Sequence, residues 1–416
     1  MNFPERGKPA SEILASLTAK RARDARWREG RTFGMVYDGG PEVHEIAEAV
    51  AREFLHENAL NTKAFPSLGE IQSEVCGWTA SLLHGDANVS GFMTSGGTES
   101  ILCAVKAARE RAKAERGVTA PEIVLPESAH AAFHKAAHYF GLKTHTVPVR
   151  ADYRADVAAM TARVNANTAL VVGSAPQYPQ GVVDPIPPLA ELAQSVGASM
   201  HVDACMGGFV LPFAERLGHA IPPWDFRVEG VTTISADLHK LGYAPKGASV
   251  ILHRNKQLRQ YQTFVFDAWL GGLYASPNIQ GTRAGMPMAC AWAVMQRLGL
   301  EGYDRLTRIT LETRDRMLAA LRAIPGLRVL GEPEAQIVAF TADPGSGLDA
   351  FALGDALLAR GGWFHDRQTP PDSLHSTVCA GNAPVIEEWA RDLTTCASEL
   401  AGRRAADRGT NYATLD

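Results

Sequence analysis

The chain has 416 residues, of which 46% are hydrophobic and 21% charged, and its formal net charge at pH 7 is −4. That length suits two or three domains, or one large α/β domain with an appendage, and either can bury a sizeable core. The near-neutral balance excludes a general attraction to nucleic acid or to an anionic membrane surface.

Six cysteines are scattered along the chain, and no two of them form a CxxC pair. This spacing argues against a zinc ribbon or a disulfide framework and is typical of reduced thiols in a cytosol. The first residues lack the apolar stretch of a signal peptide, and no run approaches the roughly 18 apolar residues of a spanning helix. We therefore expect a cytoplasmic protein with no integral membrane segment and no metal site.

Residues 1–60 are expected to form an N-terminal arm. A polar helix over 11–27 leads into a glycine-rich stretch that contains Tyr37, which on local grounds reads as a surface-loop aromatic. An amphipathic helix over 42–57 comes next, because its apolar residues recur at helical spacing. A polar loop with Asn58 and Asn61 ends the arm.

A second helix is predicted from Pro66 to about residue 84, since proline near the first turn is a start signal. A short apolar run then leads through Ser95-Gly96-Gly97-Thr98 into another helix. Free N–H groups at a helix start favour an anion, and glycines let a ligand approach the backbone closely. The simpler alternative is a helix-capping turn with no ligand.

From residue 122 the pattern alternates between short apolar strands and helices, with strands expected over 123–125, 144–149, 168–173, 199–203, 231–235 and 250–252. A helix over 128–139 would begin with His130 in its first turn. Such alternation indicates an α/β fold with a mainly parallel sheet and helices on both faces. Ligands in such sheets bind at the carboxyl ends of the strands, where Asp203 and the 174–179 segment fall.

Beyond residue 300 a long helix precedes a different pattern of short strands and two further helices. We expect a small C-terminal α+β domain over 301–416, after a large cofactor-binding domain over 61–300.

The most informative stretch is Ser235 to Ser249, a turn between two apolar runs that carries His239, Lys240 and Lys246. A lysine beside a histidine at a strand end suits an amine that forms a Schiff base with pyridoxal phosphate. That cofactor also needs a carboxylate near its ring nitrogen and an anion site for its phosphate, which Asp203 and the Ser95–Thr98 turn could supply. Each residue has a plainer reading as a solvated lysine or a helix cap, and only their joint occurrence favours the cofactor site.

Several motifs together resemble the group II pyridoxal-phosphate decarboxylase superfamily, and within it the sphingosine-1-phosphate lyases. They are Thr94-Ser95-Gly96-Gly97-Thr98-Glu99-Ser100, Ser128-Ala129-His130, His201-Val202-Asp203-Ala204 and Asp237-Leu238-His239-Lys240-Leu241-Gly242-Tyr243-Ala244-Pro245-Lys246-Gly247. The segment after Lys240 distinguishes the lyases from the amino-acid decarboxylases. The resemblance covers roughly residues 5–400.

The resemblance implies a fold-type I homodimer with shared active sites, in which the large domain has a mainly parallel seven-stranded sheet. Lys240 would carry the cofactor, Asp203 would pair with its ring nitrogen, and His130 would stack on the ring. The phosphate of the cofactor would be held by Gly97, Thr98 and His239, with Gly281 and Thr282 from the other subunit. The residues implied on the substrate side are Tyr37, Asn58, Asn61, Tyr178 and Lys246, of which Tyr178 and Lys246 are also candidates for moving protons.

The implied reaction is a retro-aldol cleavage of a phosphorylated long-chain sphingoid base into a fatty aldehyde and phosphoethanolamine. An amino-acid decarboxylase with the same cofactor, and an inactive relative that serves as a binding partner, are the alternatives. Two residues depart from the family pattern: Asn61 replaces a phosphate-side histidine, and Thr282 replaces a serine. The neutral Asn61 leaves the exact substrate open.

Overall fold

Seven strands form one sheet in the order β1-β7-β6-β5-β4-β2-β3 in the computed structural model, which describes residues 3–400, 402–410 and 412. Their bounds are β1 Ser90–Thr94, β2 Glu122–Pro126, β3 Lys143–Val147, β4 Thr168–Ser174, β5 Ser199–Asp203, β6 Thr233–Ala236 and β7 Ser249–His253. Only β7 runs antiparallel to its neighbours, β1 and β6. The predicted seven-stranded, mainly parallel sheet is confirmed.

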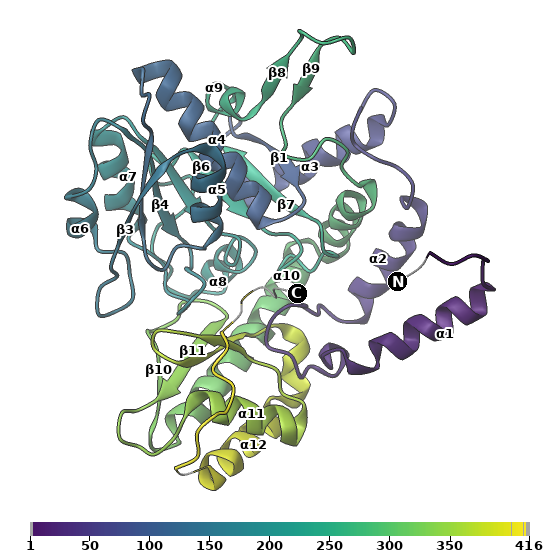
Figure 1. Ribbon diagram of the computed structural model, residues 1–416, viewed down its shortest axis with the longest axis vertical. Coiled ribbons are helices and arrows are strands. Elements are labelled where there is room, and N and C mark those ends of the chain that lie inside the picture. The colour runs from purple at the N-terminus through teal and green to yellow at the C-terminus, as the bar shows by residue number, and fades with distance from the viewer. Residues whose placement is uncertain (1–2, 401, 411, 413–416) are drawn as a thin grey trace.

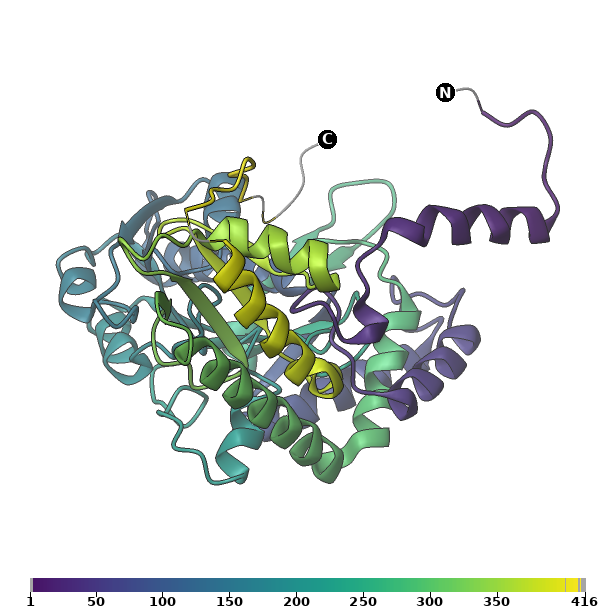
Figure 2. The ribbon, with the colours of Figure 1, turned by 90° about the horizontal axis from the view of Figure 1, so that it is seen from below.

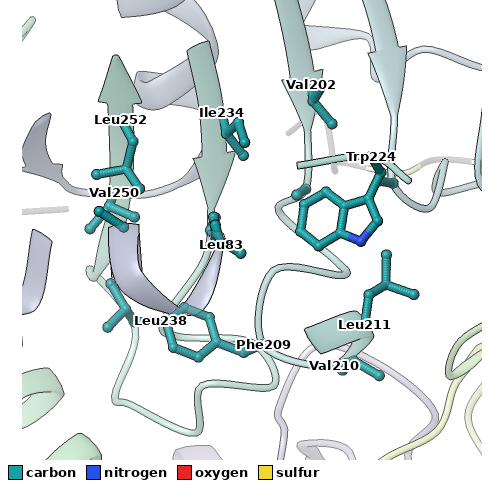
Figure 3. Packing of buried hydrophobic residues seen from close by; sticks show 14 of the residues in the cluster. Leu83, Val202, Phe209, Val210, Leu211, Trp224, Ile234, Leu238, Val250 and Leu252 are labelled. Atoms are coloured by element: carbon teal, nitrogen blue, oxygen red, sulfur yellow. The ribbon is translucent and has the colours of Figure 1, made fainter. Parts of the chain in front are cut away.

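The five inner strands are buried on both faces, and alternate side chains enter different clusters. On β4, Leu170 and Val172 pack with the helices α4 (Gly97–Arg116) and α5 (Ala132–Phe140), whereas Val171 faces the opposite cluster. Trp224 packs in that opposite cluster with Val202 of β5 and Leu211 of α8 (Leu211–Arg216) (Figure 3). Continuous apolar strands of this kind are stable because helices cover both faces.

The large domain contains further helices, which lie around this sheet or, as α2 does, to one side of it (Figure 1). They are α2 Pro41–Glu53, α3 Pro66–Leu82, α6 Val157–Thr161, α7 Ile186–Ser195, α8 Leu211–Arg216, α9 Lys256–Arg259 and the 3-10 helix η3 Gln260–Gln262. The helix expected over 128–139 begins only at Ala132, so His130 lies in the turn before it.

The N-terminal helix α1 (Ala10–Lys20) has no buried residue and projects from the body (Figure 2). Two 3-10 helices, η1 Arg21–Arg23 and η2 Trp27–Glu29, follow it. The chain then joins the C-terminal part, where Thr32 bridges Phe364 and Phe33 enters the core of the small domain.

A long helix, α10 (Gly285–Arg322), connects the two parts and is broken at Gly299, whose φ of 55° is left-handed. It runs through residue 300, where we expected a domain boundary. The small domain has a four-stranded antiparallel sheet in the order β10-β11-β13-β12. Its elements are β10 Leu327–Val329, β11 Ile337–Ala342, β12 Asp366–Gln368, β13 Ser373–Thr377, α11 Ala350–Gly361, η4 Ala380–Val385 and α12 Ile386–Glu399.

A hairpin of β8 (Phe264–Phe266) and β9 (Tyr274–Ser276) extends away from the large domain (Figure 1). Its exposed apolar side chains include Phe264, Val265, Phe266, Trp269, Leu270 and Leu273. Within the described residues, no helix combines the length and apolar character that a membrane crossing demands.

Candidate active site

A cavity of about 300 Å³ lies where β4, β5 and β6 end and α4 begins. The side chains and backbone that line it come from the 95–99 turn, from the strand ends and from the turn after β6. They include Ser95, Gly97, Thr98, His130, Ser174, Tyr178, Asp203, Asp237, His239, Lys240 and Tyr412. The topology thus brings together the linear motifs that are far apart in the sequence.

Lys240 projects from the turn between β6 and β7. Two buried residues of this turn, Leu238 and Leu241, anchor it in the core. The Nζ of Lys240 lies 3.0 Å from Oδ2 of Asp237. Burial lowers the pKa of Lys240, but the carboxylate of Asp237, with smaller contributions from neighbouring groups, more than offsets this effect, so its pKa is raised. The amine is therefore held as a cation by one carboxylate.

Asp237 is a site residue that sequence reasoning missed. Its side chain is buried, and Oδ1 has no hydrogen-bond partner among the described residues. Burial raises the pKa of Asp237, yet Lys240 and His239 together leave it below the ordinary value. Its position three residues before Lys240 was the available signal, but a lone aspartate beside a lysine is common on protein surfaces.

His239 is fixed by the backbone of the same turn. Its Nδ1 accepts hydrogen bonds from the N–H groups of Gly247 (3.3 Å) and Ala248 (3.2 Å), which leaves the proton on Nε2. Burial lowers the pKa of His239 to about 4. The ring is therefore a neutral donor, which suits a hydrogen bond to a phosphate oxygen.

Asp203 ends β5, and the backbone holds it in place. Its Oδ1 accepts from the N–H of Cys205 at 3.0 Å and from Ser235 Oγ at 3.3 Å. The carboxylate lines the cavity and is 8% exposed. Asp203 thus supplies a carboxylate in the cavity that could pair with a protonated ring nitrogen.

The start of α4 forms a cradle for an anion, because no side chain caps the first turn of this 20-residue helix. A Cβ added at Gly97 would lie 2.8 Å from Cys205 Sγ and 2.9 Å from Asp237 Oδ2, so no other residue fits there. The Oε2 atom of Glu99 accepts hydrogen bonds from the N–H and hydroxyl of Ser95. Its Oε1 atom accepts from the N–H groups of Ile279 and Gln280.

His130 lies beside this cradle. Its Nδ1 accepts from the N–H of Ala132, and its Nε2 lies 3.1 Å from the hydroxyl of Tyr412. Burial lowers the pKa of His130 below the usual value. A neutral imidazole at the cavity wall is available to stack on an aromatic ring.

Tyr178 lies in the loop after β4, and its hydroxyl donates to Asp366 Oδ2 at 3.0 Å. Its ring stacks on His375, with the ring centroids 4.1 Å apart. Asp366 and His375 both belong to the small domain, and neither was singled out from the sequence.

Tyr37 and Lys246 lie beside the Lys240 turn. The Nζ of Lys246 is 4.5 Å from the centre of the Tyr37 ring and donates to the carbonyl of His239 at 2.9 Å. Burial, and then the charge of Lys240, lower the pKa of Lys246 to about 8. Tyr37 thus belongs to the site region and not to a surface loop.

The other four predicted residues lie elsewhere in the subunit. Asn58 bridges Ala284, and the N–H of Ala59 donates to the carbonyl of Arg283 at 2.8 Å, so the 58–61 loop and the 281–284 loop form one cluster. The Asn61 side chain is exposed and accepts from the N–H of Lys63. None of Asn58, Asn61, Gly281 and Thr282 lines the 300 Å³ cavity.

The residues of the cavity fit pyridoxal phosphate. An amine, a carboxylate and an uncapped helix start face one space, which matches the aldehyde, ring nitrogen and phosphate of the cofactor. The buried, unpaired Oδ1 of Asp237 and the close packing at Gly97 are further signs of a site shaped for a polar ligand.

The pyridoxal-dependent decarboxylase conserved domain matches residues 26–343. Sphingosine-1-phosphate lyase of Arabidopsis thaliana is 44% identical over 390 residues, which are 92% of this chain and 71% of the relative. The structure of a Burkholderia pseudomallei sphingosine-1-phosphate lyase has a TM-score of 0.91 and 40% identity, covering 97% of this chain and 93% of that one. A probable L-aspartate decarboxylase of Pyrococcus abyssi is 35% identical over 338 residues, 81% of this chain and 86% of that protein. The chain belongs to the pyridoxal-dependent decarboxylase family and, within it, to the sphingosine-1-phosphate lyases.

Proposed function

We propose that this chain is a pyridoxal-phosphate-dependent aldehyde-lyase. It cleaves a phosphorylated long-chain sphingoid base into a fatty aldehyde and phosphoethanolamine. The observation that carries the proposal is the turn that places Lys240 in the cavity and Lys246 beside Tyr37 next to it. One lysine serves the cofactor, and the other supplies a cation for a second phosphate, that of the substrate.

When bound, the cofactor holds the substrate amine through its aldehyde carbon and accepts the electron pair of the bond that breaks. Asp203 keeps a proton on the ring nitrogen, and His130 orients the ring by stacking on it. The start of α4, with Gly97 and Thr98, and the Nε2–H of His239 bind the cofactor phosphate.

On the substrate side, Lys246 and Tyr37 bind the phosphate, and Tyr178 takes part in removing the proton of the 3-hydroxyl. Loss of that proton allows a carbonyl to form as the carbon–carbon bond beside the amine-bearing carbon breaks. Tyr178 is the group that returns a proton to that carbon. Binding energy at the remote phosphate orients the bond that breaks.

We also propose that the functional unit is a homodimer in the cytoplasm. The β8–β9 hairpin exposes contiguous apolar side chains that a monomer would leave in water. The adjoining cluster with Asn58, Asn61, Gly281 and Thr282 does not line the Lys240 cavity of the same subunit. It is therefore free to complete the active site of a second copy of the chain. Six free, buried cysteines agree with a reducing compartment.

The direct test is product analysis with the cofactor-loaded protein. A phosphorylated sphingoid base should yield fatty aldehyde and phosphoethanolamine in equal amounts, and its dephosphorylated form should react far more slowly because Lys246 then has no anion to bind. Release of carbon dioxide from amino acids, with no cleavage of the phosphorylated base, would overturn the proposal in favour of a decarboxylase.

A further inference from the structure

Asp366 of the small domain reaches the active site of the large domain through one hydrogen bond. The Tyr178 hydroxyl donates to its Oδ2 at 3.0 Å. His375 lies opposite Asp366 in the register of β12 and β13, stacks on the Tyr178 ring and donates from Nε2 to the Tyr178 carbonyl at 2.9 Å. Two neighbouring strands thus fix the plane of the ring and the direction of the hydroxyl.

Tyr178 lies at a junction between two cavities. It lines the 300 Å³ cavity that contains Lys240 and also an adjoining cavity of about 480 Å³ that Asp366 lines. Because its proton is directed at Asp366, the phenol oxygen is free to accept a hydrogen bond from a hydroxyl group in the Lys240 cavity.

The charges around Asp366 leave its carboxylate without a cation. In residues 3–400, 402–410 and 412, no salt bridge includes Asp366. The neighbouring Arg367 pairs with Asp355 instead. Burial raises the pKa of Asp366, although the hydrogen bond from Tyr178 partly opposes this effect.

The histidines that face this pair are neutral, and the cation that lines the same cavity, Arg367, is already paired with Asp355. Burial lowers the pKa of His375 to about 4, so its ring is neutral, and burial also lowers the pKa of His130. Tyr412 lies edge-on to the Tyr178 ring, and Glu127, Tyr153 and Arg367 line the 480 Å³ cavity.

Tyr178 cannot serve as a base by itself. Burial and the charge of Asp366 both raise the pKa of Tyr178, so the phenol keeps its proton at neutral pH. A phenol that keeps its proton can take one from a substrate only if it passes its own proton on at the same time. Among the residues that the structure describes, the one acceptor to which it is hydrogen-bonded is Asp366.

We propose that Asp366 is a positioning residue for the carbon–carbon cleavage and that it acts through the Tyr178 hydroxyl as the final proton acceptor. The O–H bond of the substrate hydroxyl breaks, its proton joins the Tyr178 oxygen, and the Tyr178 proton moves to Asp366 Oδ2. The electron pair left on the substrate oxygen forms the carbonyl as the carbon–carbon bond breaks. This inference rests on the proposed function.

The key variant is Asp366→Asn, whose side-chain oxygen still accepts the Tyr178 hydrogen bond but cannot take up the proton. General-base contributions are on the order of 100-fold or more, so kcat should fall by about that factor. Wild-type kcat/KM should fall at acidic pH as Asp366 becomes protonated, at a pH above the 3.8 of an ordinary aspartate, and Asp366→Asn should lose this acidic limb. Asp366→Glu should recover part of the activity.

Asp343→Asn is the matched control, because Asp343 belongs to the same domain and pairs with Arg328 at the surface. It should retain wild-type activity. Binding of a substrate analogue that lacks the 3-hydroxyl, measured by the change in cofactor absorbance, should be the same in wild type and Asp366→Asn. In a Tyr178→Phe background, adding Asp366→Asn should cost no further activity.

The outcomes separate the two claims. If wild-type protein cleaves no phosphorylated base, the proposed function fails and this inference with it. If wild type cleaves the base and Asp366→Asn keeps both kcat and the acidic limb, the inference alone is wrong. If circular dichroism shows that Asp366→Asn does not fold, Asp366→Glu serves as the test instead. An acidic limb of kcat/KM at the same pH in Asp366→Glu as in wild type would then overturn the inference.

Discussion

At the scale of single residues, two lysines on one turn have opposite electrostatic environments. Lys240 faces a buried carboxylate 3.0 Å away, whereas Lys246 faces an aromatic ring and a backbone carbonyl. The pKa of Lys240 is consequently raised and that of Lys246 lowered to about 8. The charge of Lys246 therefore changes close to neutral pH.

The lowered pKa of Lys246 predicts how KM changes at alkaline pH. If Lys246 binds the substrate phosphate, it must be a cation, so KM should rise as the pH passes about 8 while the neutral form takes over. Lys246→Arg should remove the rise, because arginine stays protonated throughout this range. Steady-state kinetics of the wild type and the variant at pH values on both sides of about 8 measure this change in KM.

The control for this measurement is Lys143→Arg, a change at an exposed lysine of β3. It should leave the rise in KM unchanged. The opposite pattern, in which kcat increases through pH 8 and Lys246→Arg abolishes turnover, would make Lys246 a base and contradict phosphate binding.

At the scale of elements, the start of α4 links the cavity of its own subunit to a loop that points outward. The Glu99 carboxylate accepts from the N–H groups of Ile279 and Gln280, which fixes the approach to Gly281 and Thr282. Arg283 donates to Gln72 and to the carbonyl of Ala59, which fixes the other end. Hydrogen bonds therefore hold both ends of this exposed loop. Such support is needed if Gly281 and Thr282 are to keep a fixed position in the site of a neighbouring subunit.

Subunit complementation tests this arrangement. Thr282 is exposed, so Thr282→Trp should disturb only the site of a second copy, while Lys240→Ala disables the site of its own subunit. Each variant alone should be inactive. Co-expression should restore about a quarter of wild-type activity, because half of randomly paired dimers would hold one intact site of two.

The control is each variant co-expressed with itself, which should recover nothing. Full activity of Thr282→Trp alone, or no recovery in the mixture, would show that the sites are not shared through this loop.

At the scale of the whole molecule, periodicity predicted the large sheet because its strands are apolar and its helices have the regular spacing of buried faces. The lysine turn, Asp203 and the Ser95–Thr98 turn were recognisable because each is a local motif at a strand end or helix start. Strand β12 was missed, since Asp366-Arg367-Gln368 has no apolar pattern and is a strand only through pairing with β13.

Contacts between distant segments account for the rest of what the sequence could not reveal. Arg31 pairs with Glu388, and Phe33 packs in the small-domain core, although both arginine and phenylalanine lie in what reads as an N-terminal arm. Asp366 meets Tyr178 across 188 residues of chain. No local pattern specifies such pairs, because they depend on how the two domains pack. The division at residues 60 and 300 remains a prediction.

The central claim is that Lys240, and not Lys246, is the amine on which the cofactor site is built. The most direct measurement is borohydride reduction of the cofactor-loaded protein, followed by digestion and mass spectrometry with fragmentation that separates the two lysines. The structure predicts a reduced cofactor adduct on Lys240 and none in Lys240→Ala. An adduct on Lys246, or an unmodified Lys240 in protein that retains bound cofactor, would contradict it.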